Sequence, residues 1–442
     1  MALHQQHHEH LSNELAGILS DKLVLLADPG QGLIGSHLYA NPESSKIDIV
    51  PTLNTRGRLE ISTNSLNFGG TSTFQIPPGS FLGQVWLVGT VSVDRYVHAP
   101  RGWALGAIDQ LKFQISGQSS INNIQISGQS HYDLIMSSCT TKEKRDAIIL
   151  ACGDYLNGTA AALTNQPFAV PLYLPWSNPD INGTFPYDTS TLSSNIIVEI
   201  KWKPSNQVFM GENAQTPSMP SAFNSLSLKA HQIDILGSSA FKVSSAMMRD
   251  PQLVYSFPSS LVQSFQTTQT VTSAVQGSIV LSALPQGQLC AILVRIVPAS
   301  QEGASNNQNV ITNVGILPDY VNLRYNGQDL IKYDYKKEQQ LVDIMMTEGN
   351  AYRYDTSSMA SISSGTETSY NGVVNMLPLY FDIAGMFNDK HREHVPSYGG
   401  STLEFLYRID SYSLSSSSVN FYFTYVFNCV FENQNRITSV QV

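Results

Sequence analysis

The segment Pro29–Gly35 has the spacing G-x-G-x-x-G, which in a suitable fold cradles the phosphates of a dinucleotide through backbone amides. That chemistry requires the motif to follow a strand and to open a helix within a βαβ unit. Leu23–Ala27 could form the strand, but Pro42 interrupts any helix that follows within two turns, and the rest of the chain has no α/β pattern. We therefore interpret the segment as a flexible linker and predict no bound cofactor.

Histidines are the next candidate ligands, because their ring nitrogens bind metal ions. His391 and His394 are spaced i, i+3 in a stretch that leads to Pro396, and four more histidines lie at the N-terminal tip. These four are His4, His7, His8 and His10. Since ligands need a fixed geometry, we interpret the tip as solvated and the pair as a surface loop, and we predict no metal site. The sequence also lacks a GxSxG motif and a Walker loop, so we do not expect an enzyme.

A third group of residues could mediate contact with carbohydrate. Asn157 and Asn182 each begin an Asn-Gly-Thr sequence, which fits a glycosylation acceptor and fits a tight turn equally well. The N-terminus has no secretory signal pattern, which favours turns and predicts that the protein is made in the cytoplasm of whatever cell produces it. Trp176 is the best candidate for an exposed sugar platform, whereas Trp86 and Trp202 lie in strand-like runs and are predicted to be in the core.

The overall composition excludes several classes of function. The chain has 442 residues, a hydrophobic fraction of 42% and a formal net charge of −9. Only 13% of its residues are charged, where a typical soluble domain carries about 25%. Direct nucleic-acid binding is not expected, because phosphate contacts need clustered Lys and Arg. No apolar run is long enough to span a bilayer, and Cys290 and Cys429 lie in apolar runs that predict buried free thiols.

The N-terminal region predicts a short amphipathic helix that ends at Asp28–Gly30. Its apolar positions follow the i, i+4, i+7, i+8 spacing of one helix face, and they are Leu11, Leu15, Ile18 and Leu19. Such an arm could lie on a membrane surface or pack on a neighbouring subunit. Lys22 is its only Lys or Arg, so attraction to anionic lipid is weak and we favour a protein contact. We assign residues 1–56 to this arm and its linker.

From residue 57 onward the chain has the pattern of an all-β protein. Runs rich in β-branched and aromatic residues are separated by Gly, Pro, Asn and Ser, as in Ile196–Trp202 and Leu403–Ile409. Two stretches favour helix instead, Tyr132–Leu156 and Asp329–Met346, because each contains a charged segment followed by apolar residues.

These two helical stretches belong to an internal repeat with a period near 200 residues. A Gly-Gln turn precedes each helix, at Gly128 and Gln129 in the first copy and at Gly327 and Gln328 in the second. A Pro-Leu-Tyr sequence and two further strands follow in each copy. Gly117–Gln118 offers an alternative Gly-Gln turn in the first copy. The sequence therefore predicts two tandem domains, residues 57–237 and 238–442. Each would be an eight-stranded jelly roll with an inserted helix.

This arrangement resembles the double jelly-roll major capsid proteins of icosahedral viruses, a family that includes phages with an internal membrane, large DNA viruses and virophages. The resemblance rests on the two Gly-Gln turns, their helices and the Pro-Leu-Tyr strands. It implies a homotrimer that presents six jelly rolls as a pseudo-hexagonal capsomer. The implied partners are neighbouring capsomers, minor capsid and vertex proteins, and an underlying membrane where one is present. The implied location is the capsid shell of the virion.

Two other functions remain open at this point. A β-sandwich carbohydrate-binding protein, such as a viral spike or a lectin, would need exposed aromatics in loops, and only Trp176 qualifies. An enzyme on a two-domain β fold is the weakest alternative, because no catalytic motif supports it.

Overall fold

The computed structural model describes residues 51–78, 81–99, 101–115, 124–137, 142–157, 161–174, 187–188, 195–211, 217–235, 254–271, 275–281, 288–298, 314–315, 318–330, 335–336, 362–363, 366–367, 374–375, 379–382, 402–409, 417–434 and 437–441. The predicted arm, with Leu11, Leu15, Ile18 and Leu19, lies outside these residues. The first strand begins at Pro51, so it includes the last residues of the segment expected to be linker.

The N-terminal half is a sandwich of two antiparallel sheets. One sheet has the order β1-β12-β3-β8 and the other β2-β10-β5-β6. Their bounds are β1 Pro51–Ser62, β12 Ser225–Ile235, β3 Phe81–Val93, β8 Leu163–Pro171, β2 Thr71–Ile76, β10 Ile196–Trp202, β5 Ile108–Ile115 and β6 Ile124–Ser127. Successive strands of the sandwich thus alternate between the two sheets, except that β5 and β6 form a hairpin within one sheet, as in a jelly roll.

The C-terminal half repeats this topology strand for strand. Its sheets have the orders β13-β25-β15-β23 and β14-β24-β17-β18. The bounds are β13 Val254–Val271, β25 Ser417–Gln434, β15 Gln288–Pro298, β23 Leu379–Asp382, β14 Val275–Val280, β24 Leu403–Ile409, β17 Tyr320–Tyr325 and β18 Gln328–Asp329. Two successive eight-stranded jelly rolls confirm the predicted fold class.

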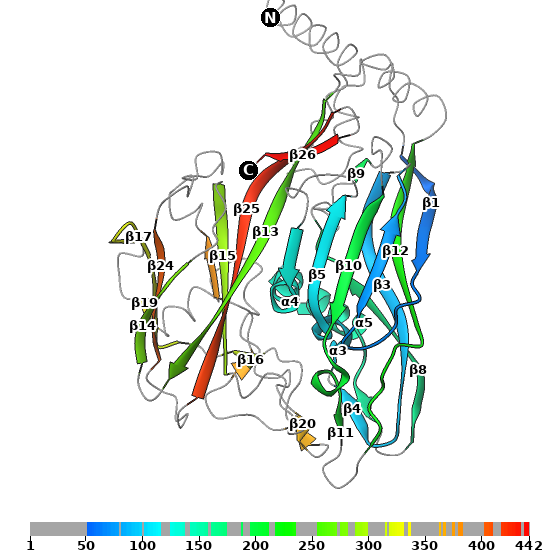
Figure 1. The fold of residues 1–442 in the computed structure, drawn as a ribbon, viewed down its shortest axis with the longest axis horizontal. Helices are drawn as coiled ribbons and strands as arrows, with labels where there is room; N and C mark the ends of the chain where they lie inside the picture. The colour runs from blue at the N-terminus through cyan, green and yellow to red at the C-terminus, as the bar shows by residue number, and fades with distance from the viewer. Residues whose placement is uncertain are drawn as a thin grey trace, which may run out of the picture.

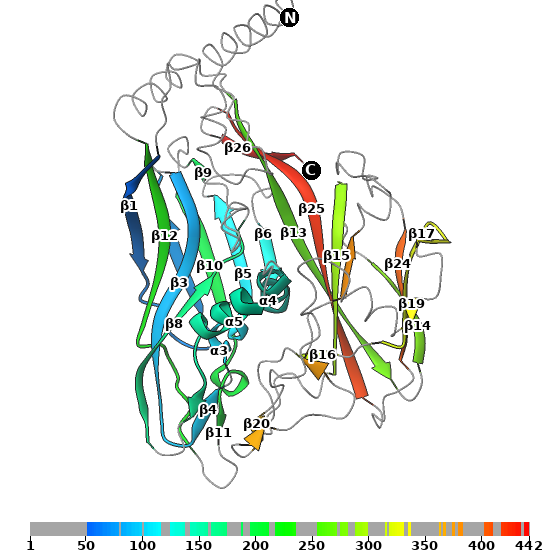
Figure 2. The same ribbon diagram turned by 180° about the vertical axis from the view of Figure 1, so that it is seen from behind.

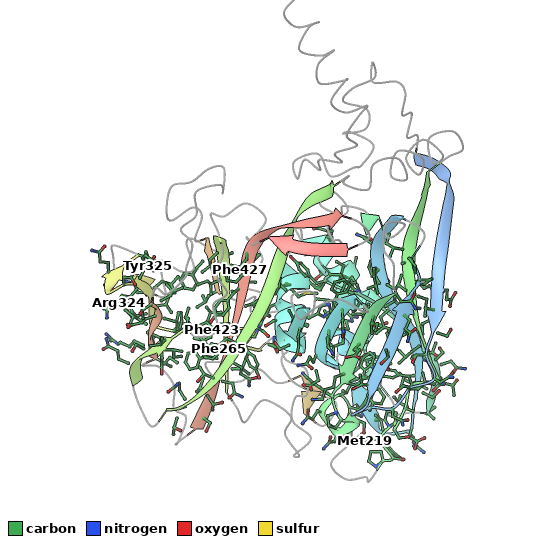
Figure 3. The ribbon with its side chains drawn as sticks, turned by 45° about the horizontal axis from the view of Figure 1, so that its top comes forward. Met219, Phe265, Arg324, Tyr325, Phe423 and Phe427 are labelled. Carbon is green, nitrogen blue, oxygen red and sulfur yellow. The ribbon has the colours of Figure 1, made fainter. Side chains whose placement is uncertain are left out.

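Alternating side chains explain why these segments form half-buried strands. Strands β10 and β24 begin 207 residues apart, at positions 196 and 403, and have the same alternation of buried and more exposed positions. Each sandwich has its own apolar core, one centred on residues such as Phe74 and Trp202 and the other on residues such as Phe405 and Phe423. Figure 3 shows Phe265, Phe423 and Phe427 along the long strands of the second sandwich, with Arg324 and Tyr325 at its far side.

Helices α3 (Trp103–Gly106), α4 (Gly128–Ser137) and α5 (Lys142–Ala151) belong to the first half. Figures 1 and 2 show α4 between β5 of the first sandwich and the β13/β25 pair of the second. The remaining short elements are β4 Val97–Ala99, β7 Leu156–Asn157, β9 Tyr187–Asp188, η4 Ser205–Gln207, β11 Met210–Gly211, β16 Val314–Gly315, β19 Tyr335–Lys336, β20 Ile362–Ser363, β21 Thr366–Glu367, β22 Val374–Asn375 and β26 Ile437–Gln441. Within the residues described, no helix has both the length and the apolar character needed to cross a membrane.

The predicted helical stretches need correction. The expected single helix over Tyr132–Leu156 is two helices, α4 and α5, and α4 begins earlier, at Gly128. The helix expected over Asp329–Met346 is wrong at the positions that the structure describes. Asp329 ends β18, and Tyr335 and Lys336 form β19, which pairs with β17. These residues are strand because their backbone continues the sheet beyond the β17–β18 hairpin.

The Gly-Gln turns that marked the repeat are not equivalent to each other. Gly128 and Gln129 form the first turn of α4, so the predicted turn at these residues is wrong. Gly327 does lie in a turn, with φ +81°, and Gln328 opens β18 opposite Tyr325. The hairpin β17–β18 corresponds in sheet order to β5–β6. Its counterpart in the first copy is therefore the connection that contains Gly117–Gln118, the alternative that the sequence left open.

The prediction that Trp202 lies in the core is confirmed, whereas the same prediction for Trp86 is wrong. Trp202 is 1% exposed and donates its indole N–H to Ser72 Oγ at 2.8 Å. Trp86 is half-buried, because its neighbours Val85 and Leu87 fill the inward positions of β3 and leave Trp86 on the outer face. Trp176 lies outside the described residues.

Candidate functional site

Helix α4 is positioned by its first residues. Ser127 acts as its N-cap, because Ser127 Oγ accepts the backbone N–H of Ser130 at 3.1 Å. Gly128 follows at a point where the helix passes against the start of β5. A Cβ atom at Gly128 would collide with the carbonyl oxygen of Ile108, so only glycine fits there. From His131 to Met136 every side chain of the helix is buried.

The surface that covers α4 is the outer face of a sheet in the second jelly roll. In β15, Ile292, Val294 and Ile296 point into the core of their own sandwich. Leu293 points the other way and joins the core of the first sandwich, together with Val262 of β13. The sheet is thus buried on both faces, which explains why β15 is a nearly continuous apolar run rather than an alternating one.

A buried ion pair crosses this interface between the two jelly rolls. Arg295 of β15 donates from Nε to Asp133 Oδ1 of α4 at 2.7 Å, and its Nη2 lies 2.7 Å from the same oxygen. The two side chains are 1% and 2% exposed. Gln129 donates from Nε2 to Asp133 Oδ1 at 3.3 Å, and the Arg295 guanidinium lies 5.9 Å from the centre of the Tyr132 ring. We call Gln129, Asp133 and Arg295 the interdomain polar centre.

The electrostatics of this centre balance two opposing effects. Burial raises the pKa of the Asp133 carboxyl above its ordinary value, because the charged form loses its hydration. The positive charge of Arg295 and the hydrogen bonds from Arg295 and Gln129 act in the opposite direction. A charge pair of this kind adds little net stability relative to apolar residues, but the loss of one member leaves the other buried without compensation. The two buried charges therefore compensate each other in the docked arrangement of the two jelly rolls.

His131 also lies on α4, but it contacts the end of β8 in the first jelly roll. Its Nε2 accepts the backbone N–H of Tyr173 at 3.1 Å, just beyond the end of β8. This contact involves the Pro-Leu-Tyr sequence that marks the repeat, since Pro171 ends β8 and Tyr173 supplies the donor. Burial lowers the pKa of His131 from 6.5 to about 4, although the Pro171 backbone acts in the opposite direction. The imidazole is therefore neutral at physiological pH.

A smaller polar contact supports the same interface. The backbone N–H of Ser127, at the end of β6, donates to Ser264 Oγ of β13 at 3.2 Å. Strand β6 is the edge of its sheet, and β13 is the edge of the facing sheet in the second jelly roll. The hydroxyl thus satisfies an edge amide that the sheet itself leaves open.

The chemistry of this site is structural. Its charged groups are sealed from solvent and bonded to each other, so they offer no reactive group to a substrate. Over the part of the chain that the structure describes, no cluster of three or more His, Cys, Asp or Glu side chains could hold a metal ion. The glycine motif at residues 29–35 and all the histidines considered as ligands lie outside the described residues.

The sequence identified only part of this site. Gln129 and Gly128 were singled out as a turn, and both prove to belong to α4 at the interface. Gly327 and Gln328 lie in the exposed β17–β18 hairpin, away from the site. Asp133 and Arg295 were not predicted. Arg295 did leave a signal, because a lone charge inside the apolar run Leu289–Val297 must be paired if that run is buried.

Comparison with known proteins gives a clear result for the fold. No protein-family model matches the chain, and no curated protein matches it in sequence. Solved structures do match over most of its length. A structure of the PBCV-1 virus capsid has 14% identity and a TM-score of 0.55, covering 87% of this chain and 96% of that chain. The Sputnik virophage solved at 3.5 Å has 10% identity and a TM-score of 0.58, covering 88% of each chain.

The mavirus major capsid protein is a third similar structure. It has 10% identity and a TM-score of 0.52, covering 89% of this chain and 91% of that chain. At such low identities the likeness concerns the fold. The chain shares the double jelly-roll architecture with these proteins.

Proposed function

We propose that this chain is the major capsid protein of an icosahedral virus. The observation that carries the proposal is the sealed interdomain polar centre, which joins two jelly rolls into one block, in a fold shared with the mavirus major capsid protein. A shell subunit needs such a block, because small changes in the angle between its halves would add up across a lattice. A freely hinged pair of domains would suit a binding protein better.

The assembly that we infer is a homotrimer. Three chains would present six jelly rolls, so that a threefold capsomer approximates a hexagon and tiles a shell with its neighbours. Minor capsid and vertex proteins would complete the shell, over an internal membrane where one is present. The net charge of −9 and the low charge content support a shell protein that has no direct contact with the genome.

The test is the native mass of the purified full-length protein, followed by electron microscopy of the same material. We expect a mass of three chains, hexagonal outlines in projection, and closed shells or flat arrays at high concentration. A monomer at high concentration would contradict the proposal. A monomer that also bound glycans on an array would replace the proposal with the carbohydrate-binding alternative.

A further inference from the structure

The two edges of the β1-β12-β3-β8 sheet differ in the backbone groups that they present. Strand β1 forms one edge of this sheet and β8 forms the other. In an antiparallel sheet the N–H and C=O of alternate residues point towards the neighbouring strand, and those of the residues between them point away from it. An edge strand therefore offers every second backbone N–H and C=O to a further strand.

The edge formed by β8 is closed to such a strand. The backbone N–H of Leu172 donates to the carbonyl oxygen of Val85 in β3 at 3.0 Å. In the register of these two strands, the residues whose N–H positions face away from β3 are Pro167, Ala169 and Pro171. Because proline has no N–H, two of the three donors that another strand would need are missing.

The edge formed by β1 has no such block. The backbone N–H of Thr63, just beyond β1, donates to the carbonyl oxygen of Leu226 in β12 at 3.4 Å. By the register of the two strands, the N–H groups of Arg58, Glu60 and Ser62 therefore point away from β12. None of these residues is proline, and no strand in the described part of the chain pairs with this side of β1.

The position of β1 leaves room for a further strand. Figures 1 and 2 both show β1 as the outermost strand of its sheet, on the side of the molecule away from the second jelly roll. The regular pairing of β1 with β12 begins at Arg56, after a break in register, and continues to Ser62. We call Arg56, Arg58, Glu60 and Ser62, the alternate residues of this run, the β1 edge.

The charges of the β1 edge select the kind of strand that it can accept. Arg56, Arg58 and Glu60 occupy alternate positions, so by register they belong to one face of the sheet. Glu60 is exposed, and its Oε2 lies 3.5 Å from Lys229 Nζ of β12, which compensates its charge. The β1 edge thus carries two arginines beyond that ion pair, in a chain whose net charge is −9. Asp or Glu at alternate positions of an added strand would pair favourably with them.

The described strands of a second copy offer no such sequence. The other edge strands of four or more residues in the jelly-roll sheets are β2, β6, β8, β13, β14, β23 and β26. Among them only β23 contains an acidic residue, which is Asp382 at its end. Charge complementarity therefore favours a strand from a different protein.

We propose that the β1 edge binds an extended segment of a different protein, in which acidic residues alternate with apolar ones. The segment would continue the sheet as a further strand, so that its main chain bonds to the outward N–H and C=O groups of β1. Apolar residues are expected at the positions between the acidic ones, because Ile61 packs against the core on the other face of β1. This inference goes beyond the proposed function and does not depend on it, since an isolated chain has the same edge.

The test measures binding of a short fluorescent peptide that alternates glutamate with valine to the full-length protein, by fluorescence anisotropy. A peptide that alternates lysine with valine is the control probe. We expect the glutamate peptide to bind and the lysine peptide not to bind. In the complex, the backbone amides of residues 56–62 should exchange with deuterium more slowly than in the free protein, because they become hydrogen-bonded.

Substitutions separate the backbone contribution from the charge. Glu60→Pro removes one outward N–H and no bond to β12, and it should weaken binding of the glutamate peptide about tenfold. Glu60→Gln removes the same charge, keeps the N–H and should not weaken binding. Arg58→Glu should weaken binding of the glutamate peptide and favour the lysine peptide. The matched control is Ala169→Pro, which removes the remaining outward N–H of β8 and should leave binding unchanged.

Near-UV circular dichroism shows whether each variant is folded, and Arg58→Glu keeps the test decisive if Glu60→Pro fails to fold. Failure of the glutamate peptide to bind the wild type would overturn the inference, and the arginines would then only guard the edge against other strands. Slow exchange of residues 56–62 in a monomeric free protein would overturn it too, because the chain itself would occupy the edge. A lower native mass of folded Glu60→Pro would overturn it in favour of a second copy.

The outcome is distinguishable from that of the proposed function. A wild-type monomer at high concentration that binds the glutamate peptide would contradict the capsid proposal and support the β1 edge as a docking strand. Wild-type protein that forms shells without binding the peptide would give the opposite result.

Discussion

Asp133 and Arg295 carry opposite charges across the described interface between the two jelly rolls. Arg295→Met should lower the free energy of unfolding by about 3–5 kcal/mol, because it leaves the Asp133 carboxylate buried without a cation. The double variant Asp133→Leu/Arg295→Met should lose less than either single variant, since it removes both charges. Denaturant titration of the three proteins measures these differences.

The matched control is an ion pair on the surface. Lys201 Nζ lies 2.6 Å from Asp109 Oδ2, but the two side chains are 55% and 41% exposed. Lys201→Met should therefore change the free energy of unfolding by only about 0–1 kcal/mol. Equal losses in Lys201→Met and Arg295→Met would mean that the buried pair does not hold the halves together.

His131 makes the stability of the protein depend on pH. In the unfolded chain this histidine takes up a proton near pH 6.5, whereas the buried imidazole resists protonation until about pH 4. Between these two values only the unfolded state gains the proton, so stability falls as the pH falls from 6.5 to 4. The full effect is about 3 kcal/mol, and above pH 6.5 this group contributes no further change.

His131→Gln isolates that contribution. The glutamine carbonyl can still accept the N–H of Tyr173, but it does not titrate. The raised pKa of Asp133 acts in the opposite direction, and it cancels when the two proteins are compared. Denaturant titrations at pH 7, 6 and 5 should show a steeper acid loss for the wild type. Parallel losses would exclude His131 as the source.

At the scale of elements, glycine is needed at the start of α4 and in the β17–β18 turn for different reasons. Gly128→Ala should destabilise the protein by about 3 kcal/mol or more, because the new methyl group would force α4 away from β5. Gly327→Ala has open space around it and suffers only the strain of φ +81°, which costs about 1–2 kcal/mol. Thermal unfolding of the two variants distinguishes them, and the reverse order would contradict this account.

The strands were predictable from sequence because the alternation of side chains within each strand is a local pattern. Ile196–Trp202 and Leu403–Ile409 alternate in sequence as they do in burial. The start of α4 was not predictable in the same way, because it depends on a contact with β5, which is distant in sequence. The N-cap Ser127 is the local signal for the start of α4, but the sequence does not reveal why glycine must follow it, since the cause is the passage of β5. Trp86 was misassigned because a bulky aromatic residue in a strand indicates an apolar contact without saying whether the partner is the core or another surface.

At the scale of the whole molecule, the predicted arm is separable from the two jelly rolls. Deletion of residues 1–26 should leave a folded trimer, because the described core contains none of these residues. Shell assembly should be impaired, since the apolar positions Leu11, Leu15, Ile18 and Leu19 would be lost as a contact with neighbouring subunits. Native mass and electron microscopy of the truncated protein measure the two effects. Normal particles would show that the arm is dispensable.

The buried position of α4 has a consequence for synthesis. Asp133 leaves the ribosome 162 residues before the arginine that neutralises it. The last long strand, β25, arrives later still. Throughout that interval a nascent chain with a finished first half would present an apolar helix and a lone carboxylate to solvent. Contacts so distant in sequence slow folding and favour aggregation. Ribosome pausing before residue 295 would therefore lengthen the most vulnerable stage in the life of this protein.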